Sequence, residues 1–561
     1  MSKYQEHQNR TFREFLAHPT NKPKPVTNSQ SFEFSNSLNY SNPSLPFTSP
    51  LARSLNSQSI MDSEEKQIHV MFLPYLAPGH MMPMVDMARL LAGNGLKVTI
   101  ITTTTNAAQF KNAIDRDIKS GRQISLATVR FPSIEAGLPE GCENLSSTTT
   151  PEMTLKLFHG IELLQPHIKM ILQKHRPDCI ASDYLFPWTV DVAIELGIPR
   201  LAFNGSGFFN LCVANSIDCH RPHNNVTSET EQFVIPGLPD KVTITRSQLP
   251  DIVKGKNEVF SALFDKLKEA ERKSFGVLMN SFYELEPAYA DHFRKVTGIK
   301  AWHLGPVSLF NRNADDRLER GGKTSIRKHS CLDWLESKKP KSVLYICFGS
   351  LTRFSKTQIS EIASALEESR HSFIWAVGKI LKSDNEDKNL DRQQDWWLPE
   401  EYEDKFKESG KGLIIKGWAP QLLILEHPAI GGFLTHCGWN SILEGICAGL
   451  PMVTWPIFAE QFYNEKLITQ VLKLGVPVGN ETWKVWANEE SPLINRHKIE
   501  KAVRTVMGDT DEAMEMRKQA SRLAAFAKIT IEEGGSSCND LKALIEDIRT
   551  YKYATGRGES R

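Results

Sequence analysis

Short apolar runs alternate with amphipathic stretches along most of the chain, beginning at Ile68. The run at 68–75 is followed by a Pro-Gly turn and then by Met84, Met87, Leu90 and Leu91 at helical spacing. The next run, at 97–103, is rich in β-branched residues. Apolar runs of this length bounded by turn residues are typical of buried strands. We predict further strands at 124–131, 179–182, 200–203 and 276–280.

The same alternation restarts after a polar segment at 306–330, which is rich in Asn, Asp, Arg, Gly and Lys and predicts an exposed linker. The strands expected beyond it are 342–348, 373–377, 412–415, 432–435 and 452–455. Strands that alternate with helices predict parallel sheets covered on both faces. The fold class is therefore α/β, with two Rossmann-like domains facing across a cleft. Sheets of this kind bind ligands at the carboxyl ends of their strands.

The two ends of the chain fall outside this pattern. Residues 1–60 are rich in Ser, Asn and Pro without apolar periodicity, which predicts a disordered N-terminal extension. Its excess of Lys and Arg over Glu leaves a plastid transit peptide conceivable. We favour a leader without function and a cytoplasmic protein. The predicted domains are an N-terminal domain at 61–305, the linker at 306–330, a C-terminal domain at 331–535, and a helix and tail at 536–561 that packs back on the N-terminal domain.

Composition excludes several classes of function. The formal net charge of +1 gives no field to hold nucleic acid or an anionic membrane. No apolar run approaches the ~20 residues that a membrane helix needs. The nine cysteines are scattered without a CxxC pair, which favours reduced thiols over disulfides or zinc. We therefore expect a soluble monomer that acts on small molecules.

The densest candidate chemistry lies at 418–461. A strand ends at Thr435, and a helix is predicted to start at about Asn440–Ser441 after His436-Cys-Gly-Trp. A helix N-terminus after a glycine-bearing turn favours an anion, and His436, Asn440 and Ser441 would add donors suited to a diphosphate. Structural alternatives stay open: Ser441 and Glu444 have the spacing of a capping box, and Trp418 and His436 could be core residues.

The whole segment from Trp418 to Gln461 resembles the plant secondary product glycosyltransferase box of the family 1 UDP-dependent glycosyltransferases, which have the GT-B fold. The resemblance extends over about residues 68–550. It implies that Trp418 stacks on uracil, that Ala419 hydrogen-bonds the uracil edge, and that the C-terminal domain binds a UDP-sugar. The other implied contacts are Gln421 and Glu444 with ribose; Ser350, His436, Asn440 and Ser441 with the phosphates, beside Trp439; and Glu460 and Gln461 with the sugar. A glutamine at position 461 indicates UDP-glucose.

A candidate base and its partner follow two predicted strands of the first domain. His80 comes directly after the first strand, and the pKa of histidine suits proton uptake near neutral pH. The alternative is a helix N-terminal histidine without a chemical task. Asp183 ends the strand at 179–182 and could orient and charge-stabilise the imidazole at the same sheet edge. The family resemblance implies the same catalytic pair and a direct displacement with inversion.

No cofactor is expected beyond the UDP-sugar co-substrate. The pairs Asp115/Asp117 and Asp509/Asp511 have the Asp-x-Asp spacing of metal-dependent transferases, but both lie in charged segments that we expect to be solvated, so we predict no metal. The stretch Gly205-Ser-Gly207 lacks the third glycine of a dinucleotide fingerprint, which disfavours a Rossmann oxidoreductase.

The N-terminal domain is expected to bind the acceptor. Candidate pocket residues, which could equally be core residues, are Phe186, Trp188, Phe208, Phe209 and the region 138–145. The sequence around them resembles the subgroup that acts on triterpenoid, steroid and flavonoid acceptors. We expect transfer of glucose to a triterpenoid or its glycoside. The alternatives are a flavonoid O-glucosyltransferase and a non-catalytic nucleotide-sugar binding protein.

Overall fold

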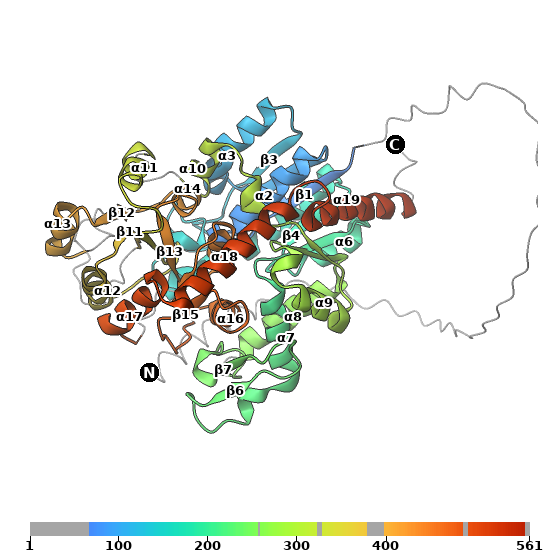
Figure 1. Ribbon diagram of the computed structural model, residues 1–561. Helices are drawn as coiled ribbons and strands as arrows, with labels where there is room; N and C mark the ends of the chain where they lie inside the picture. The colour runs from blue at the N-terminus through green and yellow to red at the C-terminus, as the bar shows by residue number, and fades with distance from the viewer. Residues whose placement is uncertain (1–66, 256–257, 323–327, 379–397, 486–491, 556–561) are drawn as a thin grey trace, which may run out of the picture. The chain divides into compact units, whose positions relative to one another are not determined.

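Seven parallel strands form the sheet of the N-terminal half in the computed structural model, which describes residues 67–255, 258–322, 328–378, 398–485 and 492–555 (Figure 1). The strand order is β3-β2-β1-β4-β5-β8-β9. The strands are β1 (His69–Leu73), β2 (Lys97–Thr103), β3 (Ile124–Val129), β4 (Cys179–Asp183), β5 (Arg200–Asn204), β8 (Gly276–Met279) and β9 (Ala301–His303). A separate antiparallel pair is formed by β6 (Gln232–Val234) and β7 (Thr243–Thr245).

Side chains along these strands alternate between two hydrophobic clusters. Val70 and Phe72 of β1 pack with residues of the helices Pro78–Gly93, Thr104–Lys119 and Ser536–Ala554. Met71 and Leu73 pack with residues of the helices Pro151–Leu163, Gln165–His175 and Thr189–Leu196. Both faces of the sheet are therefore covered, which explains why its strands are continuous apolar runs. The helices of this half are α2 (Pro78–Gly93), α3 (Thr104–Lys119), α4 (Pro151–Leu163), α5 (Gln165–His175), α6 (Thr189–Leu196), α7 (Phe208–His220), α8 (Glu258–Lys273) and α9 (Pro287–Thr297).

Six parallel strands form the second sheet, in the order β12-β11-β10-β13-β14-β15. They are β10 (Val343–Cys347), β11 (Ser372–Val377), β12 (Gly412–Lys416), β13 (Ile430–Thr435), β14 (Met452–Thr454) and β15 (Gly475–Pro477). The helices that follow the first sheet are α10 (Ala314–Glu319), α11 (Lys328–Glu336), α12 (Lys356–Ser369), α13 (Glu400–Glu408), α14 (Gln421–Leu425), α15 (Trp439–Cys447), α16 (Gln461–Lys466), α17 (Arg496–Met507), α18 (Asp511–Thr530) and α19 (Ser536–Ala554).

One hydrophobic cluster is common to both halves. It contains Phe208 and Phe209 of α7 together with Trp439 of α15 and Tyr463 of α16. Residues 68–561 accordingly form one compact unit. The domain boundaries read from the sequence stay predictions, and the extension at 1–60 lies outside the described residues.

The last helix returns to the first sheet. The backbone N–H of His303, the last residue of β9, donates to Oδ2 of Asp540 on α19 over 2.8 Å. The hydroxyl of Ser537 donates to the carbonyl of Gly305 over 2.5 Å. Leu541 and Leu544 of α19 are buried in the same cluster as β1. In Figure 1 this red helix lies beside the blue and cyan elements of the N-terminal half.

The segment expected to be an exposed linker is largely packed, so that expectation is wrong for the described part, residues 306–322. Val307 is fully buried, and Asn311 and Asp316 are nearly so. The reason is electrostatic: the charged residues that suggested solvent exposure pair instead with charges on α2 and α3. Asp316, for example, accepts from both Arg89 and Arg116.

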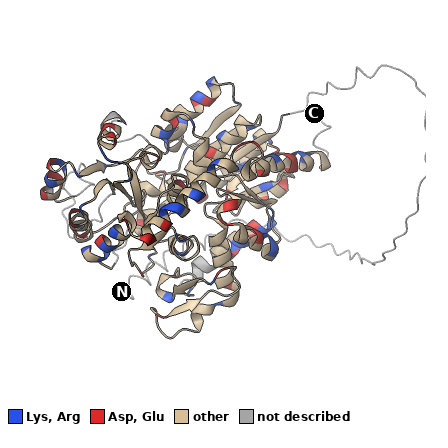
Figure 2. Ribbon diagram, in the orientation of Figure 1, with Lys and Arg blue, Asp and Glu red and all other residues tan. Residues whose placement is uncertain are grey.

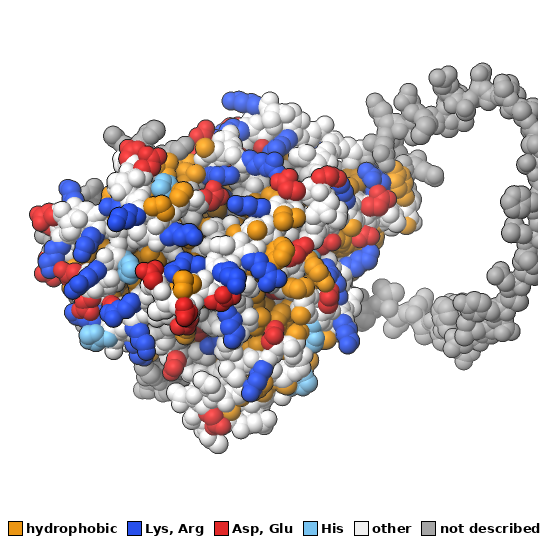
Figure 3. Space-filling model, viewed as in Figure 1, with side chains coloured by type: hydrophobic (Ala, Val, Ile, Leu, Met, Phe, Trp, Pro, Cys, Tyr) orange, Lys and Arg blue, Asp and Glu red, His pale blue; other side chains and the backbone are white. Residues whose placement is uncertain are grey.

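Charges of both signs are interspersed on the helices, whereas the strands carry few (Figure 2). The face of the molecule seen in Figure 3 likewise mixes both signs with apolar side chains. This distribution agrees with a net charge near zero. Among the described helices, none is both long and apolar enough to cross a membrane.

Candidate active site

His80 and Asp183 lie at the carboxyl ends of two adjacent strands. β1 ends at Leu73, and a short turn leads into α2, which begins at Pro78 and holds His80 in its first turn. β4, which pairs with β1 in parallel, ends at Asp183 itself. The fold thus brings together two residues that are about one hundred positions apart in the sequence.

The two side chains are hydrogen-bonded. Nδ1 of His80 lies 2.7 Å from Oδ2 of Asp183. An ionised carboxylate only accepts, so in the neutral imidazole Nδ1 carries the proton and Nε2 keeps a free lone pair. The other carboxylate oxygen accepts from the backbone N–H of Leu185 over 3.0 Å. Asp183 is fully buried, whereas the His80 side chain is 26% exposed, so the imidazole can still reach a ligand.

Burial and two neighbouring carboxyl groups set the pKa of His80. Burial lowers it, but the charge and hydrogen bond of Asp183 together with the charge of Glu460 outweigh burial and raise the pKa above its ordinary value. Glu460 belongs to the second half of the chain, and burial in turn raises the pKa of its carboxyl group, partly offset by His80. The base candidate and a donor-site candidate therefore interact electrostatically.

Aromatic rings surround the imidazole. The ring of Tyr75 meets that of His80 edge-on at 5.9 Å, and the ring of Tyr184 stacks on it at 6.4 Å. Phe186 packs against Tyr75 and Trp188 at 5.4 and 6.0 Å. An apolar molecule could lie against such a surface while presenting a hydroxyl to Nε2.

Among these rings Tyr184 and Trp188 are partly exposed, whereas Phe186, at 2% exposure, is a core residue. The other candidate acceptor residues are also buried for the most part. Phe208 and Phe209 are fully buried, packed on Phe293 and Tyr289, which makes them core residues. The region 138–145 is mixed, with Leu138 and Cys142 in the core and Leu145 partly exposed.

The donor-site candidates gather at the carboxyl ends of the second sheet. Trp418 and Ala419 follow β12, His436 follows β13, Ser350 follows β10, and Glu460 and Gln461 follow β14. Trp439, Asn440 and Ser441 form the first turn of α15, which also carries Glu444. All eleven positions implied by the resemblance thus lie at one edge of the sheet or on the elements that leave it.

Gln421 and Glu444 contact each other directly. Nε2 of Gln421 donates to Oε2 of Glu444 over 2.7 Å and lies 3.4 Å from Oγ of Ser441. The hydroxyl of Tyr345 on β10 donates to the amide oxygen of Gln421 over 3.3 Å. The capping-box reading of Ser441 and Glu444 is wrong: Gly438 is the N-cap of α15 and makes no side-chain cap.

His436 and Gln461 are constrained in different ways. Burial lowers the pKa of His436 to about 4, so its imidazole is neutral at neutral pH and can donate without adding charge. Nδ1 of His436 lacks a hydrogen-bond partner among the described residues. Oε1 of Gln461 accepts from the backbone of Ile457 and Phe458 over 2.9 and 3.1 Å, which leaves its Nε2 for a ligand. Ser350 is exposed in its turn.

The first turn of α15 also contacts the N-terminal half. Nδ2 of Asn440 donates to the carbonyl of Gly79 over 2.7 Å, and the indole N–H of Trp439 donates to the carbonyl of Asn280 over 2.8 Å. Gly207 permits this approach, because a Cβ there would lie 2.5 Å from Cη2 of Trp439. The glycines that suggested a failed dinucleotide fingerprint therefore serve close packing.

Sequence reasoning missed Asn280 as a site residue, although it ends a predicted strand and directly follows β8 in the structure, so the strand-end rule could have found it. It also missed Arg320, for which no local pattern gives a signal.

The expectation that Asp117 is solvated is wrong, because this buried carboxylate accepts from Arg89 and Arg122 over 2.5 and 2.6 Å. Within the described residues, no cluster of three or more His, Cys, Asp or Glu side chains could hold a metal ion.

Comparisons with known proteins agree with this geometry. Residues 66–309 match the family described as "Glycosyltransferase, N-terminal domain", and residues 324–482 match "UDP-glucoronosyl and UDP-glucosyl transferase". UDP-glucosyl transferase 73CC6 of Saponaria officinalis is 48% identical over 86% of this chain and 96% of its own length. UDP-glucose flavonoid 3-O-glucosyltransferase 7 of Fragaria ananassa is also 48% identical, over 87% and 97%.

A solved structure extends the likeness to three dimensions. The crystal structure of Glycyrrhiza uralensis UGT73P12 complexed with glycyrrhetinic acid 3-O-monoglucuronide superposes with a TM-score of 0.82. The two chains are 45% identical, with 88% of this chain and 98% of the other covered. The chain therefore belongs to the plant UDP-dependent glycosyltransferases, enzymes with the GT-B fold.

Proposed function

We propose that the protein transfers glucose from UDP-glucose, with inversion, to a hydroxyl of a triterpenoid or of a triterpenoid glycoside. The observation that carries the proposal is the His80–Asp183 hydrogen bond of 2.7 Å at the edge where Asn440 of the donor half contacts Gly79. A base is needed only where an acceptor hydroxyl is to be activated, so the pair favours a transferase over a binding protein.

In this proposal the C-terminal half holds the donor. Trp418 stacks on uracil, an interaction worth roughly 1–3 kcal/mol per base, and the Ala419 backbone meets the uracil edge. Glu444 accepts from the ribose hydroxyls, and Gln421 contacts the same hydroxyls with its side-chain amide. The diphosphate lies at the N-terminus of α15, where free backbone N–H groups and the helix dipole favour negative charge. His436, Asn440, Ser441 and Ser350 add donors there, and Glu460 and Gln461 contact the glucose hydroxyls.

The chemistry is a single displacement. Nε2 of His80 takes the acceptor's hydroxyl proton as the acceptor oxygen forms a bond to the anomeric carbon. The bond between that carbon and the β-phosphate oxygen breaks, and its electron pair leaves with UDP. Asp183 stabilises the imidazolium until His80 returns the proton to solvent. Attack from the face opposite UDP converts an α-linked donor into a β-glycoside.

Two acceptor classes remain in competition. The likeness to UGT73P12, crystallised with a triterpenoid monoglucuronide, favours a triterpenoid acceptor. The Fragaria ananassa relative, which is 48% identical to this chain, is named for a flavonoid, which supports flavonoid O-glucosylation as the second candidate. The partly exposed rings of Tyr184 and Trp188 would suit either class, because both offer an apolar ring system that can lie against an aromatic side chain.

The test is to incubate purified protein with UDP-glucose and a panel of triterpenoids, their glycosides, steroids and flavonoids, and to follow product masses. We expect a hexose on a triterpenoid with the wild type and none with His80→Ala. Transfer to flavonoids alone would select the second candidate, and transfer only from UDP-galactose would correct the sugar. UDP binding without transfer from any donor would leave a binding protein and refute the proposal.

A further inference from the structure

Arg320, which directly follows α10, is held between two carboxylates from different parts of the chain. Its Nε donates to Oδ2 of Asp86 on α2 over 2.8 Å, and its Nη1 donates to Oε1 of Glu444 on α15 over 2.5 Å. All three side chains are less than 10% exposed. The guanidinium therefore bridges α2, whose first turn carries His80, and α15, whose first turn is the candidate phosphate site.

The backbone of the same residue contacts the candidate stacking ring. The indole N–H of Trp418 donates to the carbonyl of Arg320 over 3.1 Å. Gly321, at φ +80°, lies so close that an added Cβ would be 2.5 Å from Cζ2 of Trp418 and 2.3 Å from Sδ of Met82. At Gly322 the nearest ring carbons would be 3.3–3.6 Å away. The segment 320–322 thus fixes the position of the indole.

Glu444 is held at both of its oxygens. Oε1 accepts from Arg320 and Oε2 accepts from Gln421, which sets the plane of the carboxylate. Each oxygen keeps a second lone pair that can accept from a hydroxyl. The hydrogen bonds from Arg320 and Gln421 compensate the Glu444 carboxyl group for its burial, and a bond to the guanidinium is among the stronger kinds.

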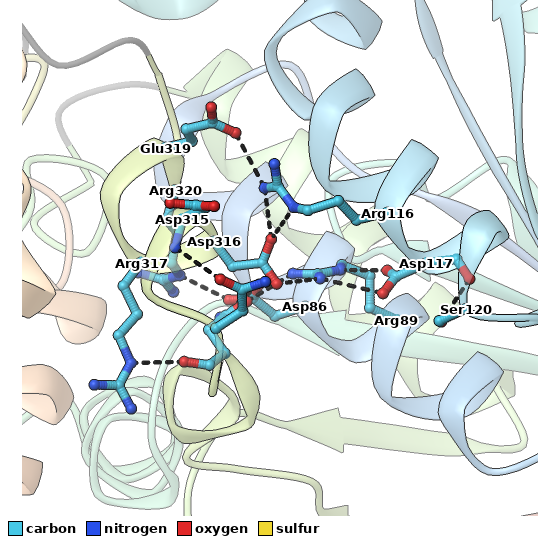
Figure 4. A network of polar contacts seen from close by, with 12 residues as sticks. Asp86, Arg89, Arg116, Asp117, Ser120, Asp315, Asp316, Arg317, Glu319 and Arg320 are labelled. Carbon is cyan, nitrogen blue, oxygen red and sulfur yellow. Dashed lines mark hydrogen bonds and ion pairs between the residues drawn. The ribbon is translucent and has the colours of Figure 1, made fainter.

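Arg320 is anchored independently of any donor. Asp316, on the preceding turn, accepts from Arg89 over 2.7 Å and from Arg116 over 2.6 Å, and Arg89 also binds Asp117 (Figure 4). These residues belong to α2, α3 and α10. Because the network is nearly buried, it holds the end of α10, and with it Arg320, in one place.

We propose that Arg320 is a positioning residue for the uridine part of the donor, acting through its guanidinium on Glu444 and through its carbonyl on Trp418. The inference rests on the proposed function, in which these two residues bind ribose and uracil. Arg320 itself does not touch the reacting atoms. Its bond to Asp86 couples both donor contacts to α2, whose first turn carries His80.

The test compares UDP with 2′-deoxy-UDP, measured by isothermal titration of full-length protein. A carboxylate aimed at the ribose hydroxyls discriminates against the deoxy analogue, because one of its hydrogen bonds is then lost. In Arg320→Met we expect the Kd for UDP to rise about tenfold or more, while the Kd for 2′-deoxy-UDP rises less, so that discrimination shrinks. The KM for UDP-glucose should rise in parallel, with the acceptor KM and the pH profile unchanged.

Two further variants separate positioning from packing. Arg317→Met removes the same charge one turn earlier on α10, where Arg317 pairs with Glu426, and should leave both Kd values unchanged. Arg320→Lys should fall between the wild type and Arg320→Met, because lysine keeps the charge but lacks the fork that reaches two carboxylates. If Arg320→Met does not fold, Arg320→Lys alone tests the proposal. The measured quantity is again the ratio of the Kd for 2′-deoxy-UDP to the Kd for UDP.

The outcomes are distinguishable. If the folded variants keep the wild-type discrimination, Arg320 does not position Glu444. Tighter UDP binding in Arg320→Met would also overturn the proposal, because Arg320 would then occupy space that the donor needs. Wild-type protein is titrated first: absence of UDP binding there would refute the proposed function, whereas UDP binding with unchanged variants would refute only the role of Arg320.

Discussion

The side-chain amide of Asn440 donates to the backbone carbonyl of Gly79 over 2.7 Å. This contact joins the first turn of α15 to the first turn of α2, one residue before His80. The N-terminus that would bind the diphosphate and the imidazole that would activate the acceptor are therefore fixed relative to each other by one amide. Displacement at the anomeric carbon requires such a fixed spacing, because small errors in approach slow it strongly.

Replacing Asn440 with aspartate should disrupt this spacing. A carboxylate cannot donate to Gly79, and it would add negative charge beside the diphosphate. We expect kcat/KM for UDP-glucose to fall by about tenfold or more, with the alanine variant less affected. Initial rates over a range of UDP-glucose concentrations provide the measurement. Asn539→Ala is the control. The side-chain amide of Asn539, at an exposed position of α19, donates to the backbone carbonyl of Gly534 in the same way. Equal rates for wild type and Asn440→Asp would contradict the expectation.

The pH dependence of the reaction should report the His80–Asp183 pair. His80 acts as a base only when neutral, so activity falls as pH drops through its raised pKa. In Asp183→Asn the carboxylate is gone and burial then dominates, which lowers the pKa. We expect the acid limb of log(kcat/KM) to move to lower pH and the maximum rate to fall about 10²–10⁴-fold. An acid limb that stays at the wild-type pH would show that another group is the base.

Gly321 should not tolerate a side chain. Alanine there would meet Trp418 and Met82 and would adopt a left-handed conformation at φ +80°. The strain costs about 1–3 kcal/mol, and displacement of the indole should weaken UDP binding as well. Gly410→Ala is the matched control, since Gly410 has φ +63° but no atom within 4 Å of its Cβ position. Thermal melts should show both variants destabilised, whereas titration should show UDP binding weakened only in Gly321→Ala.

Asp316 should matter for stability more than an exposed acid does. Removing it takes one of two carboxylate partners from Arg89, which keeps Asp117, and from Arg116, which keeps Glu319. We expect the loss of these nearly buried bonds to cost about 1–3 kcal/mol. We expect a clearly lower Tm for Asp316→Ala. Asp115→Ala breaks only the exposed pair with Lys111, worth about 0–1 kcal/mol. Similar melting temperatures for the two variants would mean that the network around α10 adds no stability.

The sequence predicted most strands because each buried strand is a separate apolar run. Of the three-residue strands, β14 was predicted, whereas β6, β7, β9 and β15 were missed. β9 ends in His303, and β15 contains Gly475 and Pro477, so neither shows an apolar run. The exposed linker was wrong for a related reason. Composition reports how many charges a segment carries, but not whether arginines elsewhere in the chain will neutralise them, as Arg89 and Arg116 do for Asp316.

The candidate site could likewise be predicted only where a local pattern marks its residues. His80 and Asp183 could be placed together because both follow strands, and parallel strands end at a common edge. Arg320 follows no strand and matches no motif. Its partners, Asp86 and Glu444, are 234 and 124 positions away, and only the folded chain determines that they converge.

The bond between Ser537 and Gly305 joins two segments of chain that run in opposite directions between the sheets. Gly305 lies where the polypeptide leaves the first sheet for the second, and Ser537 lies where it comes back. The two covalent connections between the sheets are therefore hydrogen-bonded to each other at this point. If the two sheets rotate relative to each other to admit a donor and release UDP, we expect the axis of rotation to pass near this bond. Both chain connections meet there, so a rotation about it lengthens neither of them.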